Sequence, residues 1–341
     1  MRRRGLGTWL IVLGLVVCSC SDSHDHQFIE DRAGLLLDGE RQRIDAYYRA
    51  LQTDFAVSCR VIILAEAHED INHTATELFA NLGRETNGAR GLLFLIDPIG
   101  HQIRVEVGYD LEGMFPDAFV GYLERDQLAP FFQQNRVGTG IEATTELFIA
   151  RAQRDSAGFS FDPGVELGIG NHYSGGAGAR LEVTIGSSPE PPVAAAAARS
   201  RYLPGATPEQ SLAVYRRVLT EKIKDPQLPL YTQETRRFLA DWVVTYAQQD
   251  NERRHLEEST IDRIIEAGDR AVIRFPPEER THPPYFFSRS SSGWEIDLAA
   301  MNRILHMNHK NQYHFPSLDH EYRFGFSDWE FDANGFPRAQ H

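Results

Sequence analysis

Two kinds of hydrophobic pattern alternate in the first half of the chain: segments with the period of a helix, and short continuous apolar runs. Apolar residues recur every three or four positions over Leu36–Ala50 and Ile71–Leu82, which predicts two amphipathic helices. Val57–Ala65 and Gly91–Asp97 are almost continuously apolar, as in strands that are buried on both faces of a sheet. His101–Val107 alternates apolar and polar residues after a Pro- and Gly-containing turn, so we expect it to form a hairpin with the preceding strand.

Two more helices are predicted in the same region, at Pro116–Leu128 and Ile141–Arg151. Strands that are separated by helices favour a sheet with helices on both faces. For residues 28–155 we therefore expect an α/β three-layer sandwich with a mixed sheet.

The pattern breaks down over residues 156–205, which are rich in Gly, Pro and Ala and predict a linker with one short strand, Leu181–Ile185. Thr207–Gln210 is typical of a helix start, with Thr as the cap, Pro first and Gln third. A second helix is expected over Gln233–Gln248. After it, apolar residues recur at every second position, as in strands. Helices followed by strands predict an α+β domain over residues 206–341. Its expected strands are Ala271–Phe275, Tyr285–Arg289 and Trp294–Leu298.

The N-terminal segment has the pattern of a secretion signal. Three arginines precede the apolar run Leu6–Val17, which is shorter than a membrane-spanning helix needs. The run ends in a sequence that resembles a bacterial lipobox, so we predict a lipoprotein signal over residues 1–19, lipid attachment at Cys20 and a polar tether over residues 20–27. An ordinary cleaved signal and an uncleaved anchor are the alternatives. The prediction places the protein in a bacterial cell envelope, on a membrane that it contacts through its lipid, facing the periplasm or the exterior.

Charge and cysteine content narrow the possible functions. The formal net charge is -13, and loss of the three signal arginines takes it to -16 in the mature chain. This acidic balance argues against nucleic acid as a partner, because such proteins collect phosphates on a basic surface. Three cysteines cannot form a disulfide scaffold. Cys18 and Cys20 belong to the targeting segment, and Cys59 lies in an apolar run that is typical of a core thiol.

Five carboxylates lie next to predicted strands: one precedes the first sheet-and-helix unit, one ends a buried strand and three follow another strand. They are Asp31, Asp97, Asp110, Glu112 and Asp117. If the loops at one sheet edge converge, these groups surround one point, and oxygen ligands suit a divalent cation such as Ca²⁺. A cation that holds a phosphate would be the catalytic version of the same site. The alternatives are structural: Asp117 caps a helix, and Asp97 and Asp110 form turns.

Several segments in the right order resemble the TPM domain family over about 125 residues. The chain departs from the family pattern at Asp110, where the family has Gly, and at Phe115-Pro116, where it has Leu-Thr. Asp117 stands where the family has the Asp of its L-T-D stretch. The segments that carry the resemblance are Phe28–Leu36, Asn87–Ile96, Val105–Gly113, Ala129–Phe132 and Gly138–Glu142.

The resemblance implies calcium or similar cations as ligands and a membrane-tethered protein. The family includes thylakoid proteins of photosystem repair, and some members are described as acid phosphatases. Phosphoryl transfer needs positive charge around the phosphate, for which Arg90 and Arg104 are the nearby candidates. No C-x5-R, D-x-D-x-T or R-H-G motif is present.

The last third of the chain resembles the cone-shaped fold of nuclear-transport-factor-like and limonene-epoxide-hydrolase-like proteins. The similarity rests on Asp269–Arg274 and Gly293–Leu298. It implies an enclosed pocket that binds a ligand, or a dimerising module. Four histidines with two nearby acids match no usual metal spacing, so a polar loop is the favoured interpretation. They are His306, His309, His314 and His320, beside Asp319 and Glu321.

The leading hypothesis is a lipid-anchored cell-envelope protein whose TPM-like domain binds a divalent cation, expected to be Ca²⁺, and supports the maintenance or assembly of an envelope protein partner. A metal-dependent acid phosphatase is the second hypothesis. A non-catalytic module that binds a hydrophobic ligand or dimerises is the third, and it predicts a concave, apolar-lined cavity within residues 206–341.

Overall fold

The structure is a computed structural model that describes residues 28–85, 90–167, 181–187, 196–278 and 280–339. The predicted signal at residues 1–19, Cys20 and the tether at residues 20–27 lie outside the described residues. Within the described ranges, no helix is both long enough and apolar enough to cross a lipid bilayer.

The N-terminal half is built on a five-stranded mixed sheet in the order β1-β2-β3-β4-β5. The first three strands are parallel, and β4 and β5 each pair antiparallel with the preceding strand in that order. The fifth strand comes from the predicted linker, so the short strand expected there extends this sheet. The strands are β1 Ile29–Asp31, β2 Ser58–Ile63, β3 Gly91–Asp97, β4 Gln102–Val107 and β5 Leu181–Glu182.

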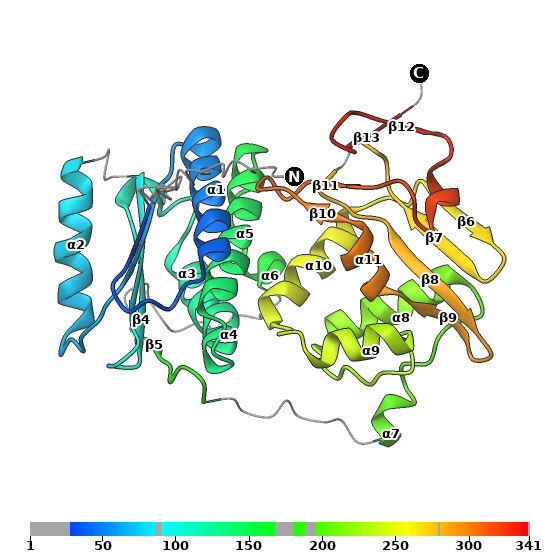
Figure 1. The fold of residues 1–341 in the computed structure, drawn as a ribbon, viewed down its shortest axis with the longest axis horizontal. Helices are drawn as coiled ribbons and strands as arrows, with labels where there is room; N and C mark the ends of the chain where they lie inside the picture. Colours follow the sequence, from blue (N-terminus) through cyan, green and yellow to red (C-terminus); the bar gives the residue numbers. More distant parts are fainter. Residues whose placement is uncertain (1–27, 86–89, 168–180, 188–195, 279, 340–341) are drawn as a thin grey trace, which may run out of the picture.

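Helices cover both faces of this sheet, as Figure 1 shows. On one face α2 (Ile71–Glu85) packs its apolar side on the strand residues that point toward it, among them Leu93. On the other face α1 (Asp38–Phe55) and α5 (Val137–Ser156) enclose the larger core. The predicted three-layer α/β arrangement with a mixed sheet is therefore confirmed.

The predicted helix at Pro116–Leu128 is divided. It consists of α3 (Asp117–Leu123) and a π-helical turn, Glu124–Leu128, which leads into α4 (Ala129–Gln133). The turn directs Glu124 inward, where its carboxyl accepts a hydrogen bond of 2.7 Å from the Val105 amide. Such turns are rare and often have a local purpose. Here the turn lets a carboxyl reach the sheet.

The C-terminal half has an antiparallel sheet in the order β6-β7-β8-β9, and its α+β class is confirmed. One face carries the helices that precede the sheet, and the other carries residues 300–331, including Tyr322, whose ring stacks on Phe286 at 4.3 Å. The cone shape stays a prediction. The elements are α8 Pro208–Thr220, α9 Gln233–Ala240, α10 Tyr246–Glu258, β6 Arg263–Ala267, β7 Arg270–Arg274, β8 Tyr285–Ser290, β9 Gly293–Ile296 and α11 Leu298–Ile304.

Short elements complete the chain: the 3-10 turns Tyr109–Leu111 and Arg323–Phe326, α6 Pro163–Glu166, α7 Ala196–Arg199, β10 His306–Met307, β11 Tyr313–His314, β12 Trp329–Phe331 and β13 Pro337–Ala339.

The prediction of one helix over Gln233–Gln248 is wrong. The chain leaves the helix after Ala240 and starts α10 at Tyr246. Thr245 accepts a hydrogen bond from the Gln248 amide, and the Gln248 side chain accepts one from the Thr245 amide. This reciprocal cap satisfies two backbone donors at the start of a new helix. The prediction used the apolar period alone and therefore merged two helices into one.

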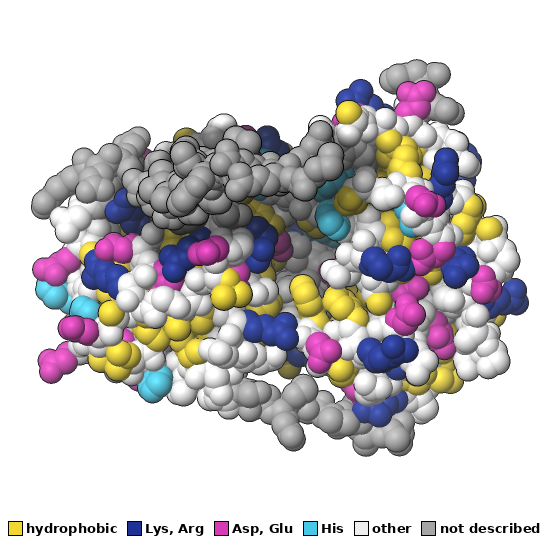
Figure 2. Space-filling model, in the orientation of Figure 1, with side chains coloured by type: hydrophobic (Ala, Val, Ile, Leu, Met, Phe, Trp, Pro, Cys, Tyr) yellow, Lys and Arg dark blue, Asp and Glu magenta, His cyan; other side chains and the backbone are white. Residues whose placement is uncertain are grey.

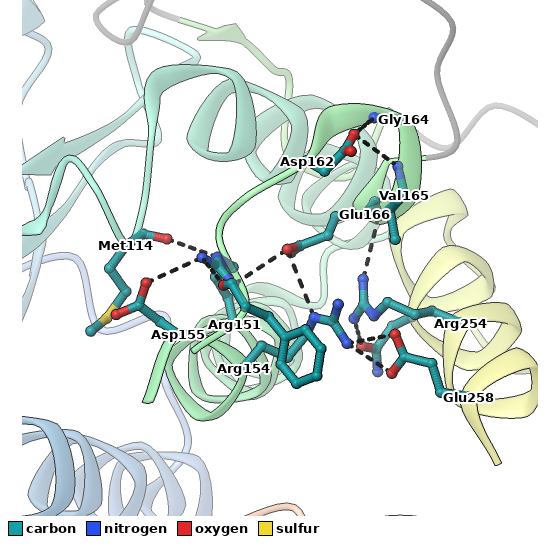
Figure 3. Close-up of polar contacts among 12 residues, drawn as sticks. Met114, Arg151, Arg154, Asp155, Asp162, Gly164, Val165, Glu166, Arg254 and Glu258 are labelled. Carbon is teal, nitrogen blue, oxygen red and sulfur yellow. Dashed lines mark hydrogen bonds and ion pairs between the residues drawn. The ribbon is translucent and has the colours of Figure 1, made fainter. Parts of the chain in front are cut away.

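The two halves meet through buried charges, which Figure 3 shows. Glu166, at the end of α6, lies 3.3 Å from Arg151 and 3.7 Å from Arg154 of α5. Arg154 also pairs with Glu258 of α10 at 2.7 Å, and Arg254 of α10 donates to the Glu166 carbonyl. A segment predicted to be linker therefore bonds to both halves, through the Glu166 carboxylate to arginines of α5 and through its main-chain carbonyl to an arginine of α10.

Candidate functional site

Two of the five predicted carboxylates, Asp31 and Asp97, lie at the same edge of the N-terminal sheet, at the ends of β1 and β3. Asp31 accepts hydrogen bonds from the amides of Leu35 and Leu36 and pairs with Arg41 at 2.7 Å. Its side chain has no exposed surface.

Asp97 is also buried and bonded to the backbone. It accepts hydrogen bonds from the amides of His68 at 2.8 Å, Ile99 at 3.1 Å and Gly100 at 2.6 Å. Both carboxylates therefore hold loops in place, and their oxygens already face protein donors.

The other three carboxylates lie elsewhere. Asp110, Glu112 and Asp117 follow β4, which runs antiparallel to β3, and the Gly108 amide bonds to Gly91 at the start of β3. Their loop is thus at the opposite edge of the sheet from Asp31 and Asp97, and all three side chains are exposed. The expected convergence of the five carboxylates is wrong, because it assumed that the loops leave one sheet edge.

The described residues contain no group of three or more His, Cys, Asp or Glu side chains that is placed to hold a metal ion. The surroundings of Asp31 and Asp97 do not fit a cation, because the oxygens of both carboxylates already accept hydrogen bonds from backbone amides or from Arg41. A cation at the exposed carboxylates stays a prediction.

The arginines that were candidates for binding a phosphate are engaged in the fold. Arg90 donates to the carbonyls of Phe55 and Ala56, and the buried Arg104 pairs with Glu106 at 2.5 Å. Cys59 is buried in the core, and burial raises the pKa of its thiol, which is the behaviour of a structural cysteine. These contacts give a structural role to each of the three residues.

A cavity of about 250 Å³ lies in the C-terminal domain, among α8, α9, α10 and α11. Much of its wall is aliphatic, including Leu219, Leu239, Leu298 and Met301. The break between α9 and α10 forms one side, where Trp242 and Val244 line the cavity. Figure 2 shows hydrophobic side chains near the middle of the molecule, over the region of α9 and α10 in Figure 1.

The carboxyl group of Glu252 lines this cavity from α10. Its Oε2 accepts a hydrogen bond of 2.9 Å from the Tyr215 hydroxyl, and its Oε1 accepts one of 2.7 Å from the Tyr285 hydroxyl. Burial raises the pKa of Glu252, while the two tyrosine bonds act in the opposite direction. A carboxyl with a perturbed pKa in an apolar cavity is a candidate binding group.

Glu252 also lines a second cavity of about 120 Å³, so its side chain separates two spaces. His255 and His282 line this smaller cavity, and their rings lie 5.2 Å apart. Burial lowers the pKa of His255 to about 3, with the nearby Arg254 adding to the effect. His255 is therefore neutral at physiological pH.

Lys224 lines the larger cavity and lies over the Tyr246 ring, 3.4 Å from its centroid. Burial lowers the pKa of Lys224 to about 8, although Asp126 of the N-terminal half acts in the opposite direction. Asp225, another lining residue, is already paired with Arg199 at 2.5 Å.

Sequence reasoning missed Glu252 because nothing near it in the chain marks it. Its partners Tyr215 and Tyr285 are 37 and 33 residues away. The only available signal was an acid on a helix between two apolar faces, and such acids are common on solvated helix surfaces. The four predicted C-terminal histidines, in contrast, do not contribute to either cavity.

The comparisons with known proteins concern the N-terminal half. The family model of the TPM domain matches residues 29–151. Among solved structures, the N-terminal domain of a protein from P. gingivalis, determined by solution NMR, is 24% identical over 38% of this chain and 82% of that chain, with a TM-score of 0.32. No curated protein matches the sequence. Residues 29–151 of this chain are a TPM domain.

Proposed function

We propose that this protein is a lipid-anchored protein of the bacterial cell envelope whose C-terminal domain binds a small, largely apolar molecule. The observation that carries the proposal is the cavity of about 250 Å³ among α8–α11, whose wall is mostly aliphatic and aromatic. Binding sites for small molecules have this character, an apolar wall with a few convergent polar groups. The TPM domain supports the binding domain and connects it to the anchored end of the chain.

The anchoring part of the proposal rests on the apolar run Leu6–Val17 and on Cys20. Replacement of Cys20 by serine removes the acylated thiol, so Cys20→Ser is expected to move the protein from the membrane to the soluble fraction of bacterial cells. Cys18→Ser is the matched control, because it lies two residues earlier in the same segment. Mass spectrometry of the purified proteins detects the lipid. Equal lipidation of both variants would contradict Cys20 as the attachment site.

Ligand binding is tested with the uncharged fluorophore N-phenyl-1-naphthylamine, whose emission rises in apolar surroundings. Val244 lines the cavity at the break between α9 and α10, so Val244→Trp is expected to fill space and weaken binding by about tenfold. Thr220→Trp adds the same ring at an exposed position of α8 and serves as the control. Equal binding to both variants would place the fluorophore elsewhere on the protein.

The family resemblance also predicts cation binding by the TPM domain and a role in maintaining an envelope protein partner. Support for these roles is the TPM match itself. The phosphatase hypothesis is less well supported, because Arg90 and Arg104 already bond to the protein. Hydrolysis of an aryl phosphate that depends on Asp110, Glu112 or Asp117 would favour it over ligand binding.

A further inference from the structure

We propose that the ligand of the cavity among α8–α11 is an organic cation, a protonated amine carried on an apolar body, and that Glu252 is its counter-ion. The inference rests on the proposed function, because it names the class of ligand for the same cavity.

The first argument is the carboxyl group of Glu252 itself. Among the described residues its partners are the two neutral hydroxyls of Tyr215 and Tyr285, and no Lys or Arg forms an ion pair with it. A carboxyl in apolar surroundings either keeps a proton or receives a cation. A carboxylate has about four acceptor positions, so two tyrosine donors leave room for a ligand donor.

A second acceptor lies one helical turn away from Glu252. Gln249 is 4% exposed and lines the same cavity. Its Nε2 donates to the Ile223 carbonyl at 2.8 Å, whereas its Oε1 is buried without a hydrogen-bond partner among the described residues. A buried acceptor without a partner is destabilising, so a ligand that donates a hydrogen here gains binding energy. An acceptor pair favours a ligand that carries donors.

The aromatic lining is the third argument. Tyr215 and Tyr231 line the inner part of the cavity, with ring centroids 6.3 Å apart. Phe238 and Trp242 line it from α9 and the following break, with centroids 5.3 Å apart, and Trp242 is 39% exposed. Aromatic faces attract organic cations through the ring quadrupole, most strongly where water is excluded. Four aromatic rings together with the carboxyl of Glu252, which has no ion-pair partner among the described residues, are the chemistry that recognises an ammonium group.

Lys224 is the one lining group that opposes a cation. Its ammonium lies over the Tyr246 ring, outside the set of four aromatic residues, and burial lowers its pKa to about 8. Other charged or titratable groups around Glu252 are Asp225, which is held by Arg199, and Arg216, which donates to the Leu256 carbonyl. The neighbouring His255 and His282 lie in the second cavity.

These groups define a pH dependence. Burial raises the pKa of Glu252, so the carboxyl holds its proton more readily than a solvated glutamate and loses its negative charge as the pH falls. Cation affinity is therefore expected to rise with pH. It rises further above pH 8, where Lys224 loses its positive charge, as long as the amine of the ligand keeps its proton. An uncharged ligand of the same shape has no such dependence.

The experiment compares protonated benzylamine with benzyl alcohol, an uncharged molecule of nearly the same shape, by calorimetry on the full-length protein. The cation is expected to bind about tenfold more tightly. Glu252→Gln removes the charge but keeps the shape, so it is expected to abolish this preference. Glu209→Gln, at an exposed position of α8, is the matched control.

Trp242→Leu supplies an independent test, because Trp242 is at the rim and its loss does not disturb a buried carboxyl. It is expected to weaken cation binding about threefold to fivefold. Equal affinities of the cation and the alcohol, or a cation preference that survives Glu252→Gln, would overturn the inference. In that case binding of N-phenyl-1-naphthylamine still supports the proposed function. If that fluorophore also fails to bind, the proposed function is wrong as well.

Discussion

The hydroxyl of Tyr122, in the TPM domain, donates a hydrogen bond to the carboxylate of Asp250, in α10 of the C-terminal domain. Both residues are buried, and Lys222 pairs with the same carboxylate. Burial and the Asp250 charge raise the pKa of Tyr122, so the hydroxyl keeps its proton and remains a donor. A side chain of the TPM domain thus helps to stabilise a charge inside its neighbour.

Removal of this donor is expected to weaken the contact between the domains. Tyr122→Phe leaves the buried Asp250 with one donor fewer, which costs about 1–2 kcal/mol of unfolding free energy. Urea denaturation measures the loss. Tyr109→Phe is the control, because Tyr109 is 80% exposed and its hydroxyl has no buried partner to lose. Equal effects of the two substitutions would show that the hydrogen bond contributes no stability.

Glu166 is expected to be the most sensitive residue in the charge cluster between the domains. Glu166→Gln leaves Arg151, which is 1% exposed, without the carboxylate at 3.3 Å, and a loss of about 2 kcal/mol follows. Glu257→Gln breaks the surface pair with Arg253 and should change the unfolding free energy by less than about 0.5 kcal/mol. Thermal unfolding of both variants tests this, and a smaller effect for Glu166→Gln than for Glu257→Gln contradicts it.

Glu124 predicts a pH dependence of stability. Burial raises the pKa of Glu124 to about 8, so between about pH 5 and 8 the folded protein holds a proton that the unfolded chain releases. The unfolded state then binds fewer protons, and stability falls as the pH rises through this range. Glu124→Gln keeps an acceptor for the Val105 amide without a charge.

Between pH 5 and 8 the unfolding free energy of the wild type is expected to fall by up to about 4 kcal/mol more than that of Glu124→Gln. Urea denaturation at several pH values gives the difference. Glu69→Gln, at an exposed position, controls for the removal of a charge. Parallel curves for the wild type and Glu124→Gln would mean that the carboxyl is ionised in the folded protein.

Substitution of Asp31 or Asp97 is expected to lower the stability of the protein without changing its binding of calcium. Asp31→Asn and Asp97→Asn each disturb a buried carboxylate that bonds to backbone amides, at a cost of about 1–3 kcal/mol. A calcium response of the protein, measured by calorimetry, should be unchanged in both variants and should depend instead on the exposed Asp110, Glu112 and Asp117. Loss of the response in Asp31→Asn at unchanged stability would place a cation at the other edge of the sheet.

The sequence predicted most elements because their signals are local. Thr207 accepts a hydrogen bond from the Gln210 amide and begins α8 at Pro208, as its spacing indicates. Strands β7, β8 and β9 agree with their predicted ranges to within two residues. Local patterns failed between Ala240 and Thr245, where α9 ends within an apolar period and Thr245 then caps the start of α10.

The candidate site was less predictable, because it depends on contacts that are distant in the chain. The position of Asp97 at the end of a strand was predicted, but neither the strand that ends at Asp31 nor the use of both carboxylates by backbone amides was. The direction of β4 separates Asp110 from both of them, and periodicity carries no information about strand direction. Glu252 becomes a candidate only when α8 and β8 bring Tyr215 and Tyr285 to it.

Helix α10 contacts both the TPM domain and the cavity, through different residues. Asp250 and Thr245 contact the TPM domain, through Tyr122 and Gln127, while Glu252 faces the cavity. Any displacement of this helix when the cavity fills is therefore transmitted to the TPM domain as a change in its contacts. By thermodynamic reciprocity, the free energy by which occupancy alters domain docking equals that by which docking alters occupancy. Helix α10 therefore couples occupancy of the cavity to the contacts of the TPM domain.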